Sequence, residues 1–265
     1  MKKTILPALL FGLFMVSCTT DDAGDDIASA NNYLELNAGN YWAYDITGTT
    51  LSGRDSLYVA NDTVIDGNGY KKLKARAIST GFYSTTLHNN SVRKLNSSLV
   101  MSGSTGLNLG AVLPVNIVLD DFIIFRENAD AGAQLSLLTD TSTQTFEGYP
   151  LNLEYSLKTV AGETLATYSS PNGDSYSDVK SVTLTLNIAI STTINVLGFD
   201  VDIPIMNSQD VITSTHYYAK NIGMVYANTT ISYDLEDFSQ AGFELPIPDS
   251  GSDTQEEFLD IYVSE

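Results

Sequence analysis

The feature that most restricts the fold of this chain is an alternation of apolar and polar residues between positions 182 and 205. Over residues 182–190 every second side chain is apolar, and the same alternation resumes over residues 199–205 after Leu197-Gly198. Because successive side chains of a β-strand point to opposite faces, this pattern predicts one long hairpin over residues 179–216 with an apolar face. The expected members of that face are Val182, Leu184, Leu186, Ile188, Ile190, Phe199, Val201, Ile203 and Ile205.

The rest of the chain from residue 33 shows similar period-2 patterns and almost no sustained helical period. Turn residues at 66–69, 88–90, 171–174 and 220–221 divide it into about ten strands. The apolar stretch 107–125 contains Pro114, which indicates two strands, or a strand and a connecting segment. We predict an all-β single domain over residues 33–248, a long curved antiparallel sheet, followed by a polar acidic tail over residues 249–265.

The first eighteen residues have the layout of a secretory signal. Two lysines precede an apolar run over residues 5–16, which is shorter than the about 20 residues that a transmembrane helix needs. Residues Met15-Val16-Ser17-Cys18 resemble the bacterial lipobox, which implies that a signal peptide of residues 1–17 is removed and that Cys18 is lipidated. The alternative, an unmodified Cys18 near another cleavage site, lacks an A-x-A pattern in this stretch. We therefore expect a palmitate-type lipid anchor in the membrane.

Residues 18–32 contain four aspartates and few apolar side chains, which predicts a flexible acidic tether. An acidic cluster this close to a lipidated cysteine resembles the surface-export signal of Bacteroidetes lipoproteins, and a plain solvated linker fits equally well. The expected location is the cell envelope, as an outer-membrane lipoprotein that is periplasmic or surface-exposed. Loss of the two signal-peptide lysines would lower the net charge from −19 to −21, which argues against nucleic acid and anionic membrane surfaces as electrostatic partners.

Two motifs near the ends of the predicted domain resemble segments of a group of uncharacterised Bacteroidetes outer-membrane lipoproteins. The first, Leu36-Asn37-Ala38-Gly39-Asn40-Tyr41-Trp42-Ala43-Tyr44, is similar to their opening strand, and the second is Tyr217-Tyr218-Ala219-Lys220-Asn221-Ile222-Gly223-Met224-Val225. The resemblance implies a half-barrel or barrel-like sheet of the lipoprotein-localisation (LolA/LolB-like) type, and it implies no established activity. We expect Trp42 to be a core anchor, with a sugar-stacking role as the alternative, and only one of Tyr217 and Tyr218 to be buried.

No pattern in the sequence indicates a catalytic, cofactor or metal site. The two histidines, His88 and His216, lie outside any G-x-S-x-G or H-E-x-x-H motif. The acids of residues 249–257 lack the spacing of a calcium loop and are typical of a solvated linker. A Ser-His-Asp triad or a carboxylate pair is assembled in space, so the sequence leaves both open, and we predict no enzyme activity, no cofactor and no metal.

Two short matches indicate possible modification. Asp55-Ser56-Leu57 and Asp62-Thr63-Val64 resemble the D-[S/T]-apolar O-glycosylation sequon of Bacteroidetes, which would place glycans on Ser56 and Thr63. Three-residue matches are frequent by chance, so ordinary surface hydroxyls are the favoured interpretation.

Two functional hypotheses follow. The first is a carrier or sensor of an apolar small molecule, which would bind to the apolar sheet face. The second is a surface-exposed binding or assembly module for a glycan or for an outer-membrane protein partner; a hydrolytic enzyme ranks third. A helix packed into the concave face of the sheet would favour the second, and the shortage of helical patterns favours the first.

Overall fold

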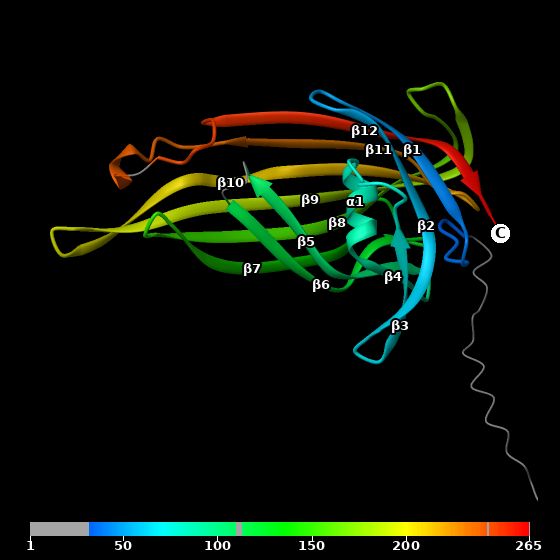
Figure 1. The fold of residues 1–265 in the computed structure, drawn as a ribbon, viewed down its shortest axis with the longest axis horizontal. Coiled ribbons are helices and arrows are strands. Elements are labelled where there is room, and N and C mark those ends of the chain that lie inside the picture. Colours follow the sequence, from blue (N-terminus) through cyan, green and yellow to red (C-terminus); the bar gives the residue numbers. More distant parts are fainter. Residues whose placement is uncertain (1–31, 110–112, 243, 265) are drawn as a thin grey trace, which may run out of the picture. The chain divides into compact units, whose positions relative to one another are not determined.

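The computed structural model describes residues 32–109, 113–242 and 244–264, with the backbone alone for residues 106–109 and 113–115. The signal peptide, the lipidation of Cys18 and nearly all of the predicted tether lie outside the described residues. Within the described part, one antiparallel sheet of twelve strands is nearly closed into a barrel (Figure 1), which confirms the prediction of an all-β single domain.

The sheet consists of two meanders joined side by side. The chain moves outward from β1 to β6 at one edge, passes to β7 at the other edge and returns to β12, which pairs with β1. The strands are β1 (Tyr41–Gly48), β2 (Ser52–Ile65), β3 (Asn68–Lys74), β4 (Ser91–Leu95), β5 (Ser98–Leu109), β6 (Leu113–Arg126), β7 (Gln134–Phe146), β8 (Tyr149–Ser169), β9 (Ser175–Val196), β10 (Phe199–Ala219), β11 (Gly223–Asp234) and β12 (Ser250–Val263).

The two edges meet near the connection between β6 and β7. The backbone N–H of Ile123 donates a hydrogen bond to Oγ of Ser136 at 2.9 Å. The carbonyl of Ile123 accepts one from Oγ1 of Thr159, on β8, at 2.6 Å. These side-chain hydrogen bonds, in place of a continuous backbone ladder, join β6 to β7 and β8, so the barrel is not fully closed there.

The predicted hairpin over residues 179–216 is confirmed. It is formed by β9 and β10, of 22 and 21 residues, which pair in antiparallel register around the turn at Leu197-Gly198. The apolar stretch 107–125 is divided between β5 and β6, which is the first of the two arrangements expected for it.

The predicted acidic tail over residues 249–265 is wrong for most of its length. Residues 250–263 form β12, which lies in the middle of the sheet between β1 and β11. Its inward-facing positions include Gln255 and the fully buried Glu257, so the segment lacks the apolar alternation by which sequence patterns reveal a strand. The solvated linker predicted for residues 249–257 is corrected for the same reason.

The structure also contains a short helix that the sequence patterns did not predict. Helix α1 (Phe82–Asn89) includes the first two of the three residues expected as a turn at 88–90, and a single 3₁₀ turn, η1 (Ser239–Ala241), follows β11 within the described residues. Eight residues are too few for a stable isolated helix, and three of them are Ser or Thr. Its stability must therefore come from tertiary contacts.

The two motifs of the lipoprotein resemblance meet in space. Trp42 on β1 is buried, and its indole N–H donates to the carbonyl of Ile222 at 2.6 Å. The hydroxyl of Tyr44 donates to the carbonyl of Met224 at 3.2 Å. Gly223 between them has φ = 116°, and a Cβ at this position would lie 2.9 Å from the indole nitrogen. The predicted core role of Trp42 is therefore confirmed, and Gly223 allows the contact.

Substitution in β12 tests the placement of the C-terminal segment in the core. Leu259 is 6% exposed, whereas Ile261 on the same strand is 42% exposed. We expect Leu259→Ala to lower the free energy of unfolding by about 2 to 5 kcal/mol because it leaves a cavity. Ile261→Ala, the control, should cost less than about 1 kcal/mol. Urea unfolding of the two variants measures the difference, and equal, small effects would show that the segment does not contribute to the core.

Candidate functional site

Helix α1 lies against the inner face of the sheet. It contacts β2, β3, β4 and β5 along its length. The ring of Tyr83 on the helix meets that of Tyr44 on β1 edge to face, and it reaches across to the other meander, where it meets His216 on β10 edge to face. A helix is therefore packed into the concave side of the barrel, between its two meanders.

The N-terminus of α1 is held by side chains from the sheet. The carboxylate of Asp55, on β2, accepts hydrogen bonds from the amides of Thr80 and Gly81. The side-chain carbonyl of Gln255, on β12, accepts one from the amide of Phe82 at 2.6 Å. Glu257 accepts from the next two amides, those of Tyr83 and Ser84. Five consecutive amides thus have partners in strands β2 and β12: that of Thr80, just before the helix, and the four from Gly81 to Ser84 that a helix leaves unpaired at this end.

Glu257 is the most unusual group of this arrangement. It is 1% exposed and also accepts a hydrogen bond from Oγ of Ser84 at 2.8 Å. Burial raises the pKa of Glu257 to about 7, while the hydrogen bonds from Ser84 and Tyr83 act in the opposite direction. Gly81 has no side chain to cap its own helix, and a Cβ there would lie 2.3 Å from the Glu257 carboxylate. The carboxylate therefore fills the space that an ordinary capping residue would occupy.

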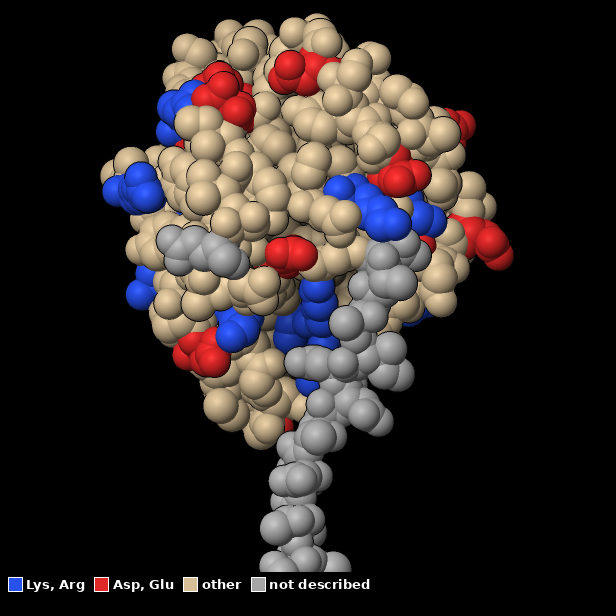
Figure 2. All heavy atoms as spheres, turned by 90° about the vertical axis from the view of Figure 1, so that its right-hand side faces the viewer, with Lys and Arg blue, Asp and Glu red and all other residues tan. Residues whose placement is uncertain are grey.

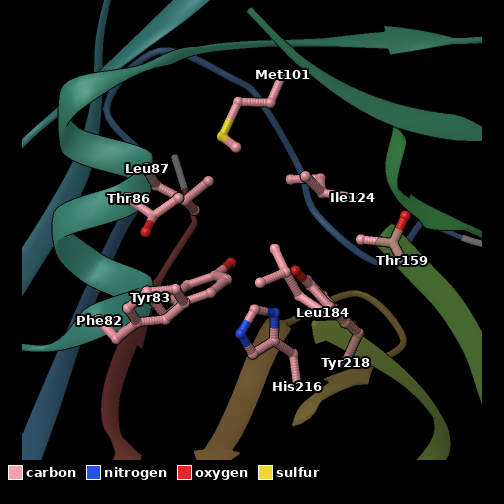
Figure 3. Close-up of a pocket in the computed structure, with 10 residues that line it drawn as sticks. All are labelled: Phe82, Tyr83, Thr86, Leu87, Met101, Ile124, Thr159, Leu184, His216 and Tyr218. Carbon is pink, nitrogen blue, oxygen red and sulfur yellow. The ribbon is translucent and has the colours of Figure 1, made fainter. Parts of the chain in front are cut away.

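A small cavity lies beside α1, between the helix and the far wall (Figure 3). Its lining residues are Phe82, Tyr83, Thr86, Leu87, Met101, Ile124, Thr159, Leu184, His216 and Tyr218. The volume open to the centre of a water molecule is about 20 Å³, which is room for about one water. The buried hydroxyls of Tyr83 and Tyr218 make no hydrogen bond of standard geometry. The cavity can hold a water or a similarly small molecule between these hydroxyls.

His216 at the cavity wall forms a serine–histidine pair. Its Nε2 lies 2.8 Å from Oγ of Ser214, and this oxygen lies 2.6 Å from Oγ1 of Thr229. Burial lowers the pKa of His216 to about 4, so the imidazole is neutral at pH 7. The Ser214 side chain is fully buried and does not line the cavity. This pair lacks both access for a substrate and a carboxylate partner in hydrogen-bond contact, and it acts as a core hydrogen-bond group.

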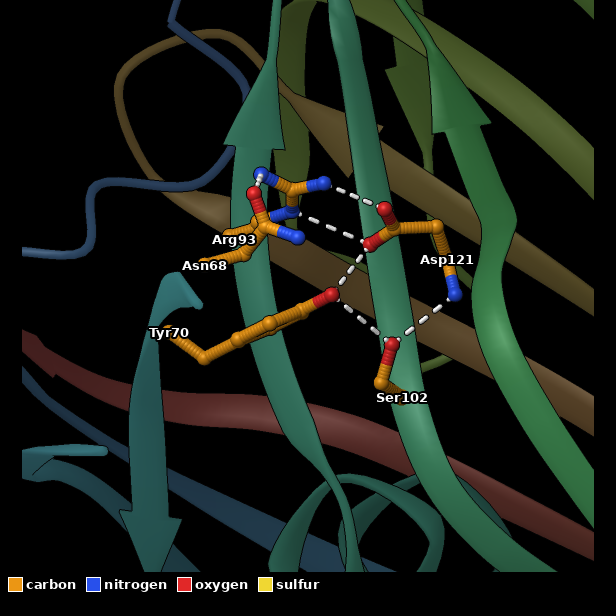
Figure 4. A network of polar contacts seen from close by, with 5 residues as sticks. All are labelled: Asn68, Tyr70, Arg93, Ser102 and Asp121. Atoms are coloured by element: carbon orange, nitrogen blue, oxygen red, sulfur yellow. Dashed lines mark hydrogen bonds and ion pairs between the residues drawn. The ribbon is translucent and has the colours of Figure 1, made fainter. Parts of the chain in front are cut away.

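A second polar cluster joins β3, β4, β5 and β6 on the other side of these strands (Figure 4). Asp121 accepts from Nε of Arg93 at 3.0 Å and from its Nη2, and also from the hydroxyl of Tyr70 at 2.5 Å. Ser102 donates to the Tyr70 hydroxyl and accepts from the Asp121 amide. The Arg93 guanidinium holds the pKa of Asp121 below its usual range. Both carboxylate oxygens are engaged, so the cluster is a clamp across an irregular part of the β5–β6 ladder.

The structure divides the nine predicted apolar-face residues into two groups. Those in the body of the barrel, Val182, Leu184, Leu186, Ile188, Ile190 and Ile205, are buried. Ile203 is half-buried, whereas Phe199 and Val201, near the hairpin turn, are exposed. Of the nine, only Leu184 lines the cavity beside α1. The predicted face is thus mostly core, with an uncovered distal end.

The predicted glycosylation positions lie on β2. Ser56 is half-buried and its hydroxyl oxygen accepts a hydrogen bond from the Arg76 amide at 3.2 Å. The preceding Asp55 is buried and engaged with α1. Thr63 is half-buried near the end of the strand. In the folded chain neither sequon is presented on a free loop, and the glycosylation of Ser56 and Thr63 stays a prediction.

Aromatic residues on the outer face of the sheet pack against one another. The rings of Tyr168 and Tyr217 stack with centroids 4.3 Å apart, and Tyr226 contacts both. Tyr217 is half-buried and Tyr218 on the opposite face is fully buried, as expected for neighbouring strand residues. The ring faces that a sugar would stack on are largely taken by other tyrosines.

Sequence patterns missed Glu257, Asp55 and Gly81. The only available signal was the run of one amide and two acids in Gln255-Glu256-Glu257, which also fits a solvated segment.

No group of His, Asp and Glu in the described part of the chain is arranged to hold a metal ion, and no described helix has the length and apolarity to cross a membrane. No family model, curated protein or solved structure matches this chain significantly. The lipoprotein resemblance therefore stays a prediction.

Substitution of Glu257 tests its ionisation. Its pKa is 4.5 in a model peptide and about 7 in the fold, so between these values the folded state holds a proton that the unfolded chain has released. The contribution of Glu257 to the free energy of unfolding therefore falls as pH rises through this window. Relative to Glu257→Gln, we expect the wild type to lose about 2 to 3 kcal/mol between about pH 5 and about pH 8. Urea unfolding of both proteins measures this loss, and a constant difference would contradict it.

Substitution of Asp121 tests the clamp on β3–β6. We expect Asp121→Asn to lower the free energy of unfolding by about 1 to 3 kcal/mol, because it removes a bidentate charge-assisted pair with Arg93. The control is Asp62→Asn, which removes an exposed ion pair with Lys71 and should change stability by less than about 0.5 kcal/mol. Equal effects in chemical denaturation would show that the network does not fix these strands.

Proposed function

We propose that this protein is a lipid-anchored, non-enzymatic module of the cell envelope that binds a partner through its outer surface. The observation that carries the proposal is the helix inside the barrel. Helix α1 lies on the concave side against β2 to β5, and its first amides are bonded to Asp55, Gln255 and Glu257. A carrier of a lipid-sized ligand needs a cavity of about 300 Å³ or more, whereas the space beside α1 accommodates about one water.

Covering of the apolar sheet face supports the same proposal. The six body residues from Val182 to Ile190 and at Ile205 are buried by other parts of the chain. They contribute to stability as a core, so they need no ligand to cover them. The predicted signal peptide and Cys18 anchor complete the proposal by placing the module on the outer membrane.

A carrier of a small apolar molecule is the second candidate. It is supported by the apolar walls of the cavity and by the tyrosine hydroxyls of Tyr83 and Tyr218, which could orient one polar group of a ligand. Such a ligand would have to displace α1 and break its bonds to Glu257. This requirement makes the second candidate the weaker one.

Native mass spectrometry of the purified Cys18→Ser chain distinguishes the two functions. The outer-surface module predicts the mass of the polypeptide alone. A stoichiometric bound lipid or other apolar molecule would contradict it and favour the carrier. Leu87→Ala serves as a control, because it enlarges the cavity beside α1 and should allow a small apolar molecule added in solution to be detected.

A further inference from the structure

The tip of the β9–β10 hairpin carries the apolar sheet face beyond the body of the barrel. In Figure 1 this hairpin reaches farthest from the end at which the C-terminus lies. Residue 192 pairs with Leu151 near the start of β8, and residues 194–201 extend past it as a two-stranded ribbon. Leu197 is 95% exposed and Phe199 is 76% exposed, and Val196 and Val201 beside them are also exposed. Four large apolar side chains therefore gather on one protruding turn.

The backbone of the turn makes this composition more unusual. Leu197 has φ = 54° and Gly198 has φ = 88°, the left-handed values that two-residue hairpin turns need at both central positions. Asparagine or aspartate followed by glycine is preferred there, and the β2–β3 turn of this chain has Asp66-Gly67 in the same conformation. The Leu197 side chain is exposed, so it adds no hydrophobic stabilisation to the fold. An apolar residue that is both strained and exposed indicates a role outside the fold.

The tip is also rigidly organised on its polar side. Asn195 donates to the carboxylate of Asp200 at 3.0 Å and accepts from the Gly198 amide at 3.0 Å. Oγ1 of Thr193 donates to Asp202 at 2.7 Å. These bonds fix the register of the two strands on one face, while the apolar side chains project from the other. A preorganised apolar tip loses little entropy on docking.

Charge indicates the kind of surface that the tip meets. Residues 181–219 contain three aspartates and no lysine or arginine. The described basic residues instead gather in the first half of the domain, where residues 32–126 hold eight of them, and Figure 2 shows them interspersed with acids at the end opposite the tip. Asp200 and Asp202, on the polar face of the tip, are repelled by anionic lipid and are attracted to a basic rim.

The tip lies at the end of β10 that is far from the start of the described chain. The carbonyl of Asn32 accepts a hydrogen bond from the Asn221 amide just beyond the C-terminal end of β10, and the 21 residues of β10 span about 65 Å.

We propose that the tip formed by Val196, Leu197, Phe199 and Val201 docks into an apolar pocket of a partner protein, with lysines and arginines around the rim of that pocket. This inference rests on the proposed outer-surface function and names the surface that performs it. The acidic side chains guide the approach of the partner, and Leu197 and Phe199 supply the buried contact.

The first experiment tests whether the fold itself needs the leucine. Leu197→Asn creates the preferred turn pair in the full chain, so we expect its melting temperature to rise by about 1 to 3 °C. Glu147→Asn, at the matching left-handed position of the β7–β8 turn, is the control for the substitution. A lower melting temperature for Leu197→Asn would show that the leucine serves the fold and would overturn the proposal.

The second experiment identifies the occupant. A photoreactive phenylalanine analogue is placed at Val201 or, as a control, at Glu147 of the full chain, in the cells that make it. We expect one protein adduct at position 201 only, and its yield to fall at least about tenfold with Leu197→Asn and Phe199→Thr. The partner is then purified, and its affinity should fall by a similar factor with both tip variants and weaken with salt.

Several results would overturn the proposal. An adduct with a second copy of this chain would make the tip a self-association surface. Tip-dependent binding to phosphatidylcholine vesicles, or to vesicles that also contain phosphatidylglycerol, would make the occupant a membrane. Equal adducts at positions 201 and 147 would exclude a specific site. A bound lipid in native mass spectrometry would contradict the proposed function, whereas a clean polypeptide mass without a tip-dependent adduct would contradict the tip alone.

Discussion

The rest of the structure depends on the pairing of the N-terminal amides of α1 with side chains of the sheet. Buried amides must be hydrogen-bonded, and a helix of eight residues cannot form stably by itself. Asp55, Gln255 and Glu257 supply these bonds from β2 and β12, strands that lie on either side of β1. The carboxylates also sit at the positive end of the helix dipole, which favours their charge. Through these contacts the helix is fixed inside the barrel and the concave face becomes a core.

The interior combines this apolar core with a few polar groups whose ionisation is strongly perturbed. Burial raises the pKa of Glu257 and lowers that of His216, so the two groups respond to acid in opposite directions. Below neutral pH, folding is accompanied by protonation of Glu257. The buried His216 imidazole, in contrast, stays neutral at pH values at which it would be protonated in the unfolded chain. Perturbed pKa values often mark catalytic sites, but here both groups are enclosed and bonded to neighbours of the fold. Their arrangement favours a structural role for both side chains.

One alternating pattern gives two different surfaces along the same hairpin. Where β8 and β10 flank it within the barrel, the apolar face of β9 is core, as at Leu186 and Ile188. Where the hairpin extends beyond its neighbours, the same alternation leaves Phe199 and Val201 in solvent. The length of the hairpin relative to the adjacent strands therefore decides whether an apolar residue stabilises the domain or remains available for a partner.

The sequence by itself determined the all-β class, the β9–β10 hairpin and the core position of Trp42, because period-2 alternation and aromatic content act locally and are visible in a short window. It did not determine the strand β12, the helix α1 or the site around Glu257. The inward positions Gln255 and Glu257 of β12 are polar, so this part of the strand resembles a linker, and α1 is stabilised by side chains more than 170 residues away. Only the tertiary structure brings those partners together, and only the relative lengths of neighbouring strands decide which part of the apolar face stays uncovered.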